Sequence, residues 1–168
     1  MYLKVNGKYS SFNSELANNE KNDCFVRALA VAADVDYETA HQTAKEIFGR
    51  EDKKGTNGFM TFKVFDNARK AGLMIGRKVI KADVLGRVDI KNKYKVKGEV
   101  IWRKKTLKSF VESHKTGRYI VTVAGHALAV IEGELQDWGN LAYQPTRKVL
   151  SAYRIMPEEV KSNQLTLF

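Results

Sequence analysis

The chain has 168 residues, of which 43% are hydrophobic, and its formal net charge at pH 7 is +10. This length and composition predict one folded domain with a real core and exclude a disordered chain. The longest apolar run is too short to cross a bilayer and the opening residues alternate like a strand, so we expect a cytoplasmic protein with no membrane partner.

The chain contains one cysteine and three histidines, and they are widely scattered. A single cysteine cannot form an internal disulfide, which fits a reducing compartment. Structural zinc sites need closely spaced ligands of these two types, which the chain lacks. We therefore expect neither a metal nor another cofactor.

The positive charge is concentrated in the middle of the chain. Residues 61–108 carry 15 Lys or Arg and 4 Asp or Glu, whereas the net charge is −1 for residues 1–60 and zero for residues 109–168. Such a basic block is typical of a surface that binds polyanions, nucleic acid above all. A solvated face that only keeps the protein soluble is an equal alternative.

The first half of the chain reads mostly as helices. Alternating residues predict two short strands at 2–5 and 8–12, joined by a turn at Asn6 and Gly7. Apolar spacing and glycine content predict helices at about residues 23–33, 37–48 and 60–71, with a loop at 49–58.

The second half reads mostly as strands. Residues 73–105 are strand-like and basic, and Thr106 can cap a helix that ends near residue 115. Further strands are predicted at residues 118–124, 126–132, 135–138 and 147–155. Helices followed by antiparallel strands predict an α+β fold, in which N-terminal helices pack on a C-terminal antiparallel sheet.

Four lysines alternate within the basic segment. Lys91, Lys93, Lys95 and Lys97 are expected on one face of a single strand. They repel one another unless a polyanion or open water faces them, so they are candidate nucleic-acid contacts. Lysines on an edge strand also prevent aggregation, which is the alternative interpretation.

Cys24 is expected in the first turn of the helix at 23–33, with Asn22 and Asp23 supplying the N-cap. The positive end of the helix dipole favours the thiolate, which is the nucleophilic form of cysteine. A buried core cysteine is the alternative.

His126 opens an apolar strand directly after Gly125. If this strand turns back around residues 132–134, residues whose numbers sum to about 266 face each other, which places Asp137 and Asn140 within reach of the ring. Either side chain would fix the ring tautomer and leave the other ring nitrogen for a thiol.

The order of these features resembles the papain-like cysteine peptidases: a cysteine opening an early helix, a glycine-histidine opening a late strand, then an aspartate or asparagine. The resemblance covers about residues 18–138, and it is nearest to small bacterial and phage members related to bacteriocin-processing and cell-wall peptidases. It implies a papain-like fold and a thiolate–imidazolium pair of Cys24 and His126. Asp137 would orient the ring, with Asn140 as the alternative.

The same resemblance implies an oxyanion hole with two donors. One is the backbone N–H of the cysteine, and the other is a side-chain amide shortly upstream, often glutamine. Six residues before Cys24 lies Asn18, a shorter amide, and Asn19 and Asn22 are further candidates.

The chain ends in a short apolar tail. Residues 1–156 are expected to form one domain, and residues 157–168 a polar linker followed by Gln164, Leu165, Leu167 and Phe168. This ending resembles the pentapeptide Gln-Leu-x-Leu-Phe that docks proteins onto the bacterial DNA sliding clamp. It implies the clamp as partner, with DNA as a further one, in a bacterial host cell. A terminal strand packed on the sheet is the alternative.

Two hypotheses follow. The first is a papain-like cysteine peptidase, or another thiol hydrolase, of phage or mobile-element type that is tethered to the clamp. The second is an inactive scaffold of the same fold that binds the clamp and DNA and modulates host replication.

Overall fold

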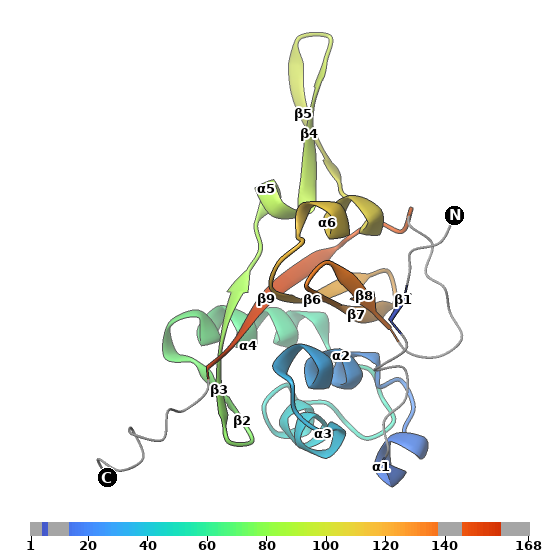
Figure 1. Cartoon of the computed structure of the whole chain (residues 1–168), viewed down its shortest axis with the longest axis vertical. Coiled ribbons are helices and arrows are strands. Elements are labelled where there is room, and N and C mark those ends of the chain that lie inside the picture. Colours follow the sequence, from blue (N-terminus) through green and yellow to red (C-terminus); the bar gives the residue numbers. More distant parts are fainter. Residues whose placement is uncertain (1–4, 7–13, 138–145, 159–168) are drawn as a thin grey trace.

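The computed structural model describes residues 5–6, 14–137 and 146–158, and within them the fold is α+β (Figure 1). The helices are α1 (Glu15–Asn18), α2 (Cys24–Ala33), α3 (Tyr37–Glu46), α4 (Gly58–Ala71), α5 (Arg87–Ile90) and α6 (Leu107–Ser113). The strands are β1 (Val5–Asn6), β2 (Leu73–Ile75), β3 (Lys78–Val84), β4 (Lys91–Val96), β5 (Glu99–Lys104), β6 (Arg118–Val123), β7 (His126–Ile131), β8 (Glu134–Gln136) and β9 (Ser151–Glu158).

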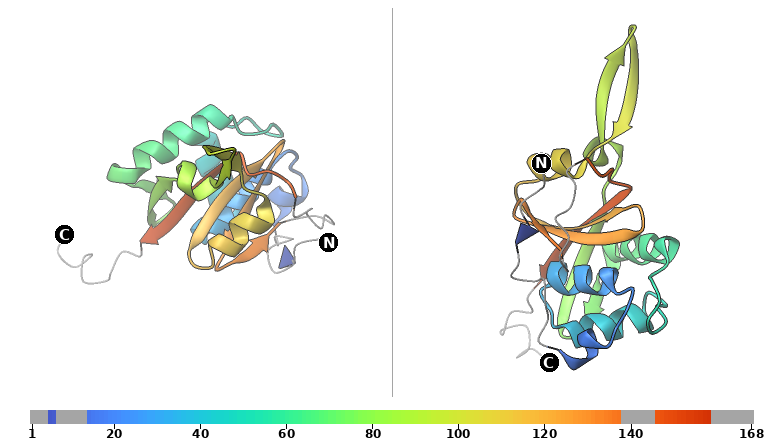
Figure 2. Two further views of the ribbon diagram at one scale, coloured as in Figure 1. Left: turned by 90° about the horizontal axis from the view of Figure 1, so that it is seen from above. Right: turned by 90° about the vertical axis from the view of Figure 1, so that its right-hand side faces the viewer.

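Most strands belong to one sheet. Its order is β1-β8-β7-β6-β9-β3-β2, and every pairing is antiparallel except that of β1 with β8. Strands β4 and β5 pair only with each other and form a hairpin that projects from the body (Figures 1 and 2). The α+β prediction is confirmed, although β2 and β3 from the basic middle segment also join the main sheet.

The central strand β6 is covered on both faces, which explains why it is apolar and largely buried. On one face, Arg118 donates hydrogen bonds to the carbonyls of Val31 and Ala32 in α2. On the other face, the next residue, Tyr119, packs edge-on against Phe110 of α6 with ring centroids 5.6 Å apart. Helix α2 therefore lies against the sheet in a fixed position.

Small side chains allow α2 to lie close to the sheet. Eight of its ten residues are buried, and five of those eight are alanine or valine residues in the run 28–33. Phe25 joins Phe48 and Phe65 in an aromatic cluster that ties α2 to the neighbouring helices, with the Phe25 and Phe48 centroids 4.9 Å apart. Burial on this scale holds the start of the helix, and so Cys24, in place.

Three local predictions were wrong. Asn6 lies in β1, which pairs with β8, rather than in a turn. The backbone partners that β8 offers outweigh the local turn preference of an Asn-Gly pair. Strand β4 ends at Val96, so Lys97 lies in the turn. Strand β9 continues to Glu158, so the first two residues of the expected linker are paired in the sheet.

None of the helices in the described part of the chain is long and apolar enough to cross a membrane.

Candidate active site

The start of α2 and the start of β7 meet, because α2 packs along β7. Cys24 is the first residue of α2, and His126 is the first residue of β7. A two-residue turn precedes β7, since Val123 pairs with His126. Gly125 occupies that turn with φ +70°, a conformation that favours glycine.

The hairpin of β7 and β8 brings His126 and Asp137 together. Ala129 pairs with Gln136, close to the predicted register, and Asp137 follows directly after β8. The Nε2 atom of His126 lies 2.9 Å from Oδ1 of Asp137, whose side chain is 1% exposed. This contact leaves Nδ1 of the ring for the thiol. The alternative orienter, Asn140, lies outside the described residues.

The environment of Cys24 favours its thiolate. Burial raises the pKa of the thiol, but hydrogen bonds from His126 and from the backbone N–H groups of Ala127 and Phe25, with the charge of His126, lower it below its usual value overall. Low pKa values of this kind are typical of reactive cysteines.

The environment of His126 favours its protonated form. Burial lowers the pKa of the imidazole, but hydrogen bonds and charge interactions with Asp137 and Cys24 outweigh it and raise the pKa to about 9. The two shifts have opposite signs and share one cause, the mutual attraction of the two groups, to which Asp137 adds at His126 and two backbone N–H groups add at Cys24. Both shifts therefore favour the thiolate–imidazolium form of the pair over the neutral form.

A cavity of about 350 Å³ opens onto the two side chains. Its wall includes Cys24, His126 and Phe25, together with residues from the 55–61 segment, from β6 and from β9. A nucleophile and a base at the wall of one cavity are what acyl transfer requires of a substrate site.

The N-cap of α2 differs from the prediction. Asp23 occupies the N-cap position, but its side chain makes no capping hydrogen bond. Its Oδ2 atom instead accepts from Nε of Arg27 at 2.9 Å and from the hydroxyl of Tyr37 at 2.8 Å. A guanidinium and a phenol attract this carboxylate more strongly than the helix amides do.

The asparagines predicted for the oxyanion hole do not line the cavity. Asn18 and Asn19 are exposed, and Nδ2 of Asn19 donates to the carbonyl of Glu15. Nδ2 of Asn22 donates to the carbonyl of Lys53 at 3.0 Å, which ties this residue to the 49–58 loop. Asn22 has φ +51°, a left-handed conformation that the sequence did not indicate.

Sequence reasoning missed the polar residues that complete the cavity wall, among them Thr56 and Ser151. The Oγ1 atom of Thr56 is buried and makes no hydrogen bond to the described residues. These residues lie far from Cys24 in the chain and no spacing marks them. The glycines at 55 and 58, on either side of Thr56, were the only local signal.

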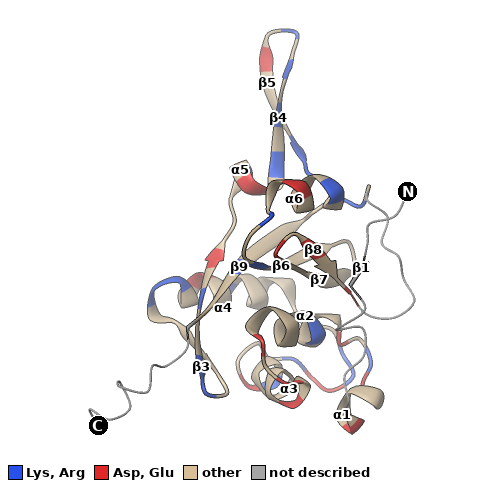
Figure 3. Ribbon diagram, in the orientation of Figure 1, with Lys and Arg blue, Asp and Glu red and all other residues tan. Residues whose placement is uncertain are grey.

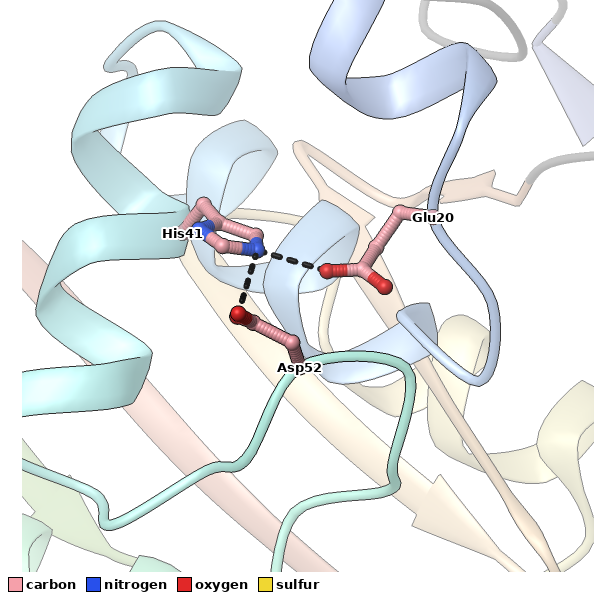
Figure 4. Close-up of side chains that lie close together, drawn as sticks. All are labelled: Glu20, His41 and Asp52. Atoms are coloured by element: carbon pink, nitrogen blue, oxygen red, sulfur yellow. Dashed lines mark hydrogen bonds and ion pairs between the residues drawn. The ribbon is translucent and has the colours of Figure 1, made fainter.

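A second histidine–carboxylate cluster lies at the start of the 49–58 loop (Figure 4). The Nε2 atom of His41 is 2.6 Å from Oε2 of Glu20 and 3.7 Å from Oδ1 of Asp52. Such a set of ligand atoms could hold a metal ion, which the sequence did not predict.

Cations of the protein already occupy this cluster. Nη1 of Arg50, on a side chain that is 1% exposed, lies 3.1 Å from Oε2 of Glu20, and Lys45 pairs with Asp52. Burial raises the pKa of Glu20, but its hydrogen bonds from Arg50, His41 and the Lys21 backbone lower it to about 2. A buried guanidinium beside the carboxylate repels a metal ion, so the cluster is structural.

The cluster anchors the loop that forms part of the cavity wall. The backbone N–H of Lys53 donates to Oε1 of Glu20 at 2.8 Å, and Nη2 of Arg50 donates to the carbonyl of Lys21 at 3.0 Å. Both ends of the short segment 50–53 are therefore held to the residues that lead into α2.

The other predicted contacts are separate from the cavity. Lys91, Lys93 and Lys95 lie on β4 in the projecting hairpin, and Lys97 lies at its tip, φ +50°. None of the four lines the cavity. The tail residues Gln164, Leu165, Leu167 and Phe168 lie outside the described residues.

Neither a family model, nor a curated protein, nor a solved structure matches the chain.

Proposed function

We propose that the protein is a cysteine peptidase of the papain-like type, with Cys24 as nucleophile, His126 as acid and base, and Asp137 as the residue that orients the ring. One observation carries the proposal: Nε2 of His126 lies 2.9 Å from Oδ1 of the buried Asp137, and the same histidine lines one cavity together with Cys24. The α+β architecture and the order of the three residues along the chain support it.

The first half of the reaction forms an acyl-enzyme. The Cys24 thiolate attacks the carbonyl carbon of a peptide bond in the cavity, and the carbonyl oxygen becomes an oxyanion. As the C–N bond breaks, the His126 imidazolium gives its proton to the leaving amine. The products are a thioester on Cys24, a free amine and a neutral imidazole.

The second half releases the acyl group. Neutral His126 takes a proton from water, the hydroxide attacks the thioester, and the C–S bond breaks. The acid product leaves, and the thiolate and the imidazolium are restored. Asp137 holds the ring in one tautomer throughout and stabilises its positive charge.

The oxyanion would be held by the backbone N–H of Cys24. The second donor that the papain-like resemblance implies is not supplied by Asn18 or Asn22, since neither lines the cavity. An enzyme with one such donor fewer would be slower by about 10²–10³-fold. We therefore expect the protein to cleave unfolded peptides slowly.

The test is acylation of the only thiol. The full chain is mixed with an activated acetyl ester and then with a mixture of unfolded peptides, and both are followed by mass spectrometry. We expect one acetyl group on Cys24 and cleaved peptides, and neither with Cys24→Ala. Acylation no faster than that of free cysteine, with no cleavage, would contradict the proposal.

We further propose that the C-terminal tail recruits the protein to the bacterial sliding clamp, because Gln164, Leu165, Leu167 and Phe168 match all four specified positions of the clamp-binding pentapeptide. Tethering would raise the local concentration of the enzyme on replicating DNA. Binding to purified clamp is expected to fall at least about tenfold with Leu167→Ala and Phe168→Ala together, a loss of about 1.4 kcal/mol or more. Equal binding by this variant and the unchanged chain would remove the clamp from the account.

The inactive scaffold is the alternative that the tail allows. It predicts that deleting residues 164–168 abolishes the effect of the protein on a bacterial host, whereas Cys24→Ala does not. The enzyme predicts that both changes abolish it.

A further inference from the structure

The hairpin of β4 and β5 extends away from the body as a two-stranded ribbon (Figures 1 and 2). Its strands have six residues each, so the ribbon is about 20 Å long. The hairpin turns at Lys97 and Gly98, both of which have positive φ, as a tight two-residue turn requires. Nothing in its pairing contributes to the main sheet.

The two faces of the ribbon differ in charge. Lys91 pairs with Lys104, Lys93 with Trp102 and Lys95 with Val100, and paired residues share a face. The guanidinium of Arg87 lies 4.5 Å from the centroid of the Trp102 ring. We call the set Arg87, Lys91, Lys93, Lys95 and Lys104 the lysine face; it holds five cations and no carboxylate.

The opposite face is nearly neutral. Asn92 pairs with Arg103, Tyr94 with Ile101 and Val96 with Glu99, which leaves one cation and one anion. A charge that served only solubility has no reason to gather on one face of the ribbon. Figure 3 shows the basic residues along the projecting strands.

The lysine face costs stability in the absence of a partner. Lys91 stands directly across from Lys104, and like charges in that position destabilise a strand pair. None of the cations of this face forms an ion pair with a carboxylate among the described residues. The face is therefore an unneutralised strip of positive charge on a projecting element.

We propose that the lysine face binds double-stranded DNA through its phosphates, without reading sequence. The strip has the sign and spacing to follow a phosphate backbone, and a two-stranded ribbon is narrow enough to enter a major groove about 12 Å wide. Its distance from the main body lets it approach a duplex unhindered. Each aromatic ring on the ribbon has a guanidinium over one face, Arg87 on Trp102 and Arg103 on Tyr94, so that face is not available for stacking on a single-stranded base.

The test compares two variants of the full chain that lose the same charge. The ribbon variant carries Lys91→Gln, Lys93→Gln and Lys95→Gln. The matched control changes Lys63, Arg69 and Lys70 to Gln, three exposed cations of α4 within the same basic segment. Binding to a labelled 20-base-pair duplex of mixed sequence is measured by fluorescence anisotropy between about 50 and 200 mM salt.

The ribbon variant is expected to bind about 100-fold more weakly near 100 mM salt. The slope of log affinity against log salt should become shallower by about 2.7, because each lost phosphate contact removes about 0.9. The control should bind within about threefold of the unchanged chain. The single variant Lys95→Gln should show about one third of the change in slope, which guards against misfolding of the triple variant.

Three results would overturn the proposal. They are no duplex binding by the unchanged chain at 50 mM salt, equal weakening by the two triple variants, and tighter binding to a single strand than to the duplex. Acylation of Cys24 is expected to be the same in both triple variants, so failure of this proposal is separable from failure of the peptidase proposal.

Discussion

Two histidines of the molecule, His126 and His41, have a carboxylate oxygen within 3 Å of Nε2, and they differ in what else each pair contacts. Asp137 contacts Nε2 of His126, and Cys24 lies on the other side of the ring. Cys24 and His126 line a cavity, whereas Asp137 does not. His41 contacts Glu20 at 2.6 Å, but Arg50 already binds that carboxylate, and no thiol or hydroxyl group of the described residues lines the small hollow beside it.

The contrast teaches that a histidine–carboxylate pair alone does not indicate chemistry. At the first site, the Asp137 carboxylate stabilises the positive charge of His126, and that charge in turn favours the Cys24 thiolate. At the second, the carboxylate serves to neutralise a buried guanidinium and to hold the 50–53 segment.

The largest expected effect comes from the same substitution at each histidine. His126→Gln should lower kcat/KM for peptide cleavage by about 10⁴-fold, because the general acid and base is lost. His41→Gln should leave kcat/KM within about threefold and lower the free energy of unfolding by about 1 kcal/mol. Steady-state kinetics and thermal unfolding of both variants check this. Equal losses of activity would erase the distinction between the sites.

The next effect concerns the partner carboxylate of His126. Asp137→Asn should lower kcat by about 10²–10⁴-fold, since an uncharged amide does not stabilise the imidazolium as the carboxylate does. The pH profile should shift too. Activity requires protonated His126, whose pKa of about 9 sets the alkaline limb, and loss of the carboxylate lowers that pKa. An alkaline limb that stays in place in the variant would show that Asp137 does not act on the ring.

The corresponding change at the other site is Glu20→Gln, and its effect should be on stability. Removing this carboxylate leaves Arg50 charged and buried, which should cost about 3 kcal/mol of unfolding free energy. Because folding lowers the pKa of Glu20 to about 2, its contribution is present above pH 4.5 and is lost as pH falls toward 2. The variant should therefore lose less stability on acidification than the unchanged chain does. Denaturant titrations at pH 7 and pH 3 measure this, and parallel losses would argue against the pairing.

The smallest effect is expected at the asparagines. Asn18→Ala and Asn22→Gly should each change kcat by less than about threefold, because neither side chain lines the cavity. Glycine is the fitting replacement at position 22, since it tolerates φ +51° without strain. Loss of an oxyanion donor would cost about 10²–10³-fold. A kcat loss of that size in either variant would return that residue to the oxyanion hole.

The sequence indicated Cys24, His126 and Asp137 because each lies at or next to the end of a helix or strand, and local sequence rules detect such ends. The cysteine follows an Asn-Asp pair, the histidine follows Gly125, and the aspartate follows a two-residue hairpin at Glu132 and Gly133. Chain order and hairpin register then sufficed to bring the last two together.

Local rules could not find the contacts that join distant segments. Arg50 and Glu20 are 30 residues apart, and nothing in their spacing marks the pair. The carbonyl of Lys53 draws the amide of Asn22 toward the loop, and Arg27 with Tyr37 draws Asp23 away from the helix amides. In each case a partner from elsewhere in the fold outweighed the local preference on which the prediction depended.

The central claim, that His126 activates Cys24, is tested most directly by the pH dependence of alkylation. Because Cys24 is the only thiol, the rate of its reaction with iodoacetamide reports its ionisation without any substrate. We expect the apparent thiol pKa to lie below the ordinary value of 9.0 in the unchanged chain and to rise toward it in His126→Gln. An apparent pKa of about 9 in both proteins would contradict the account.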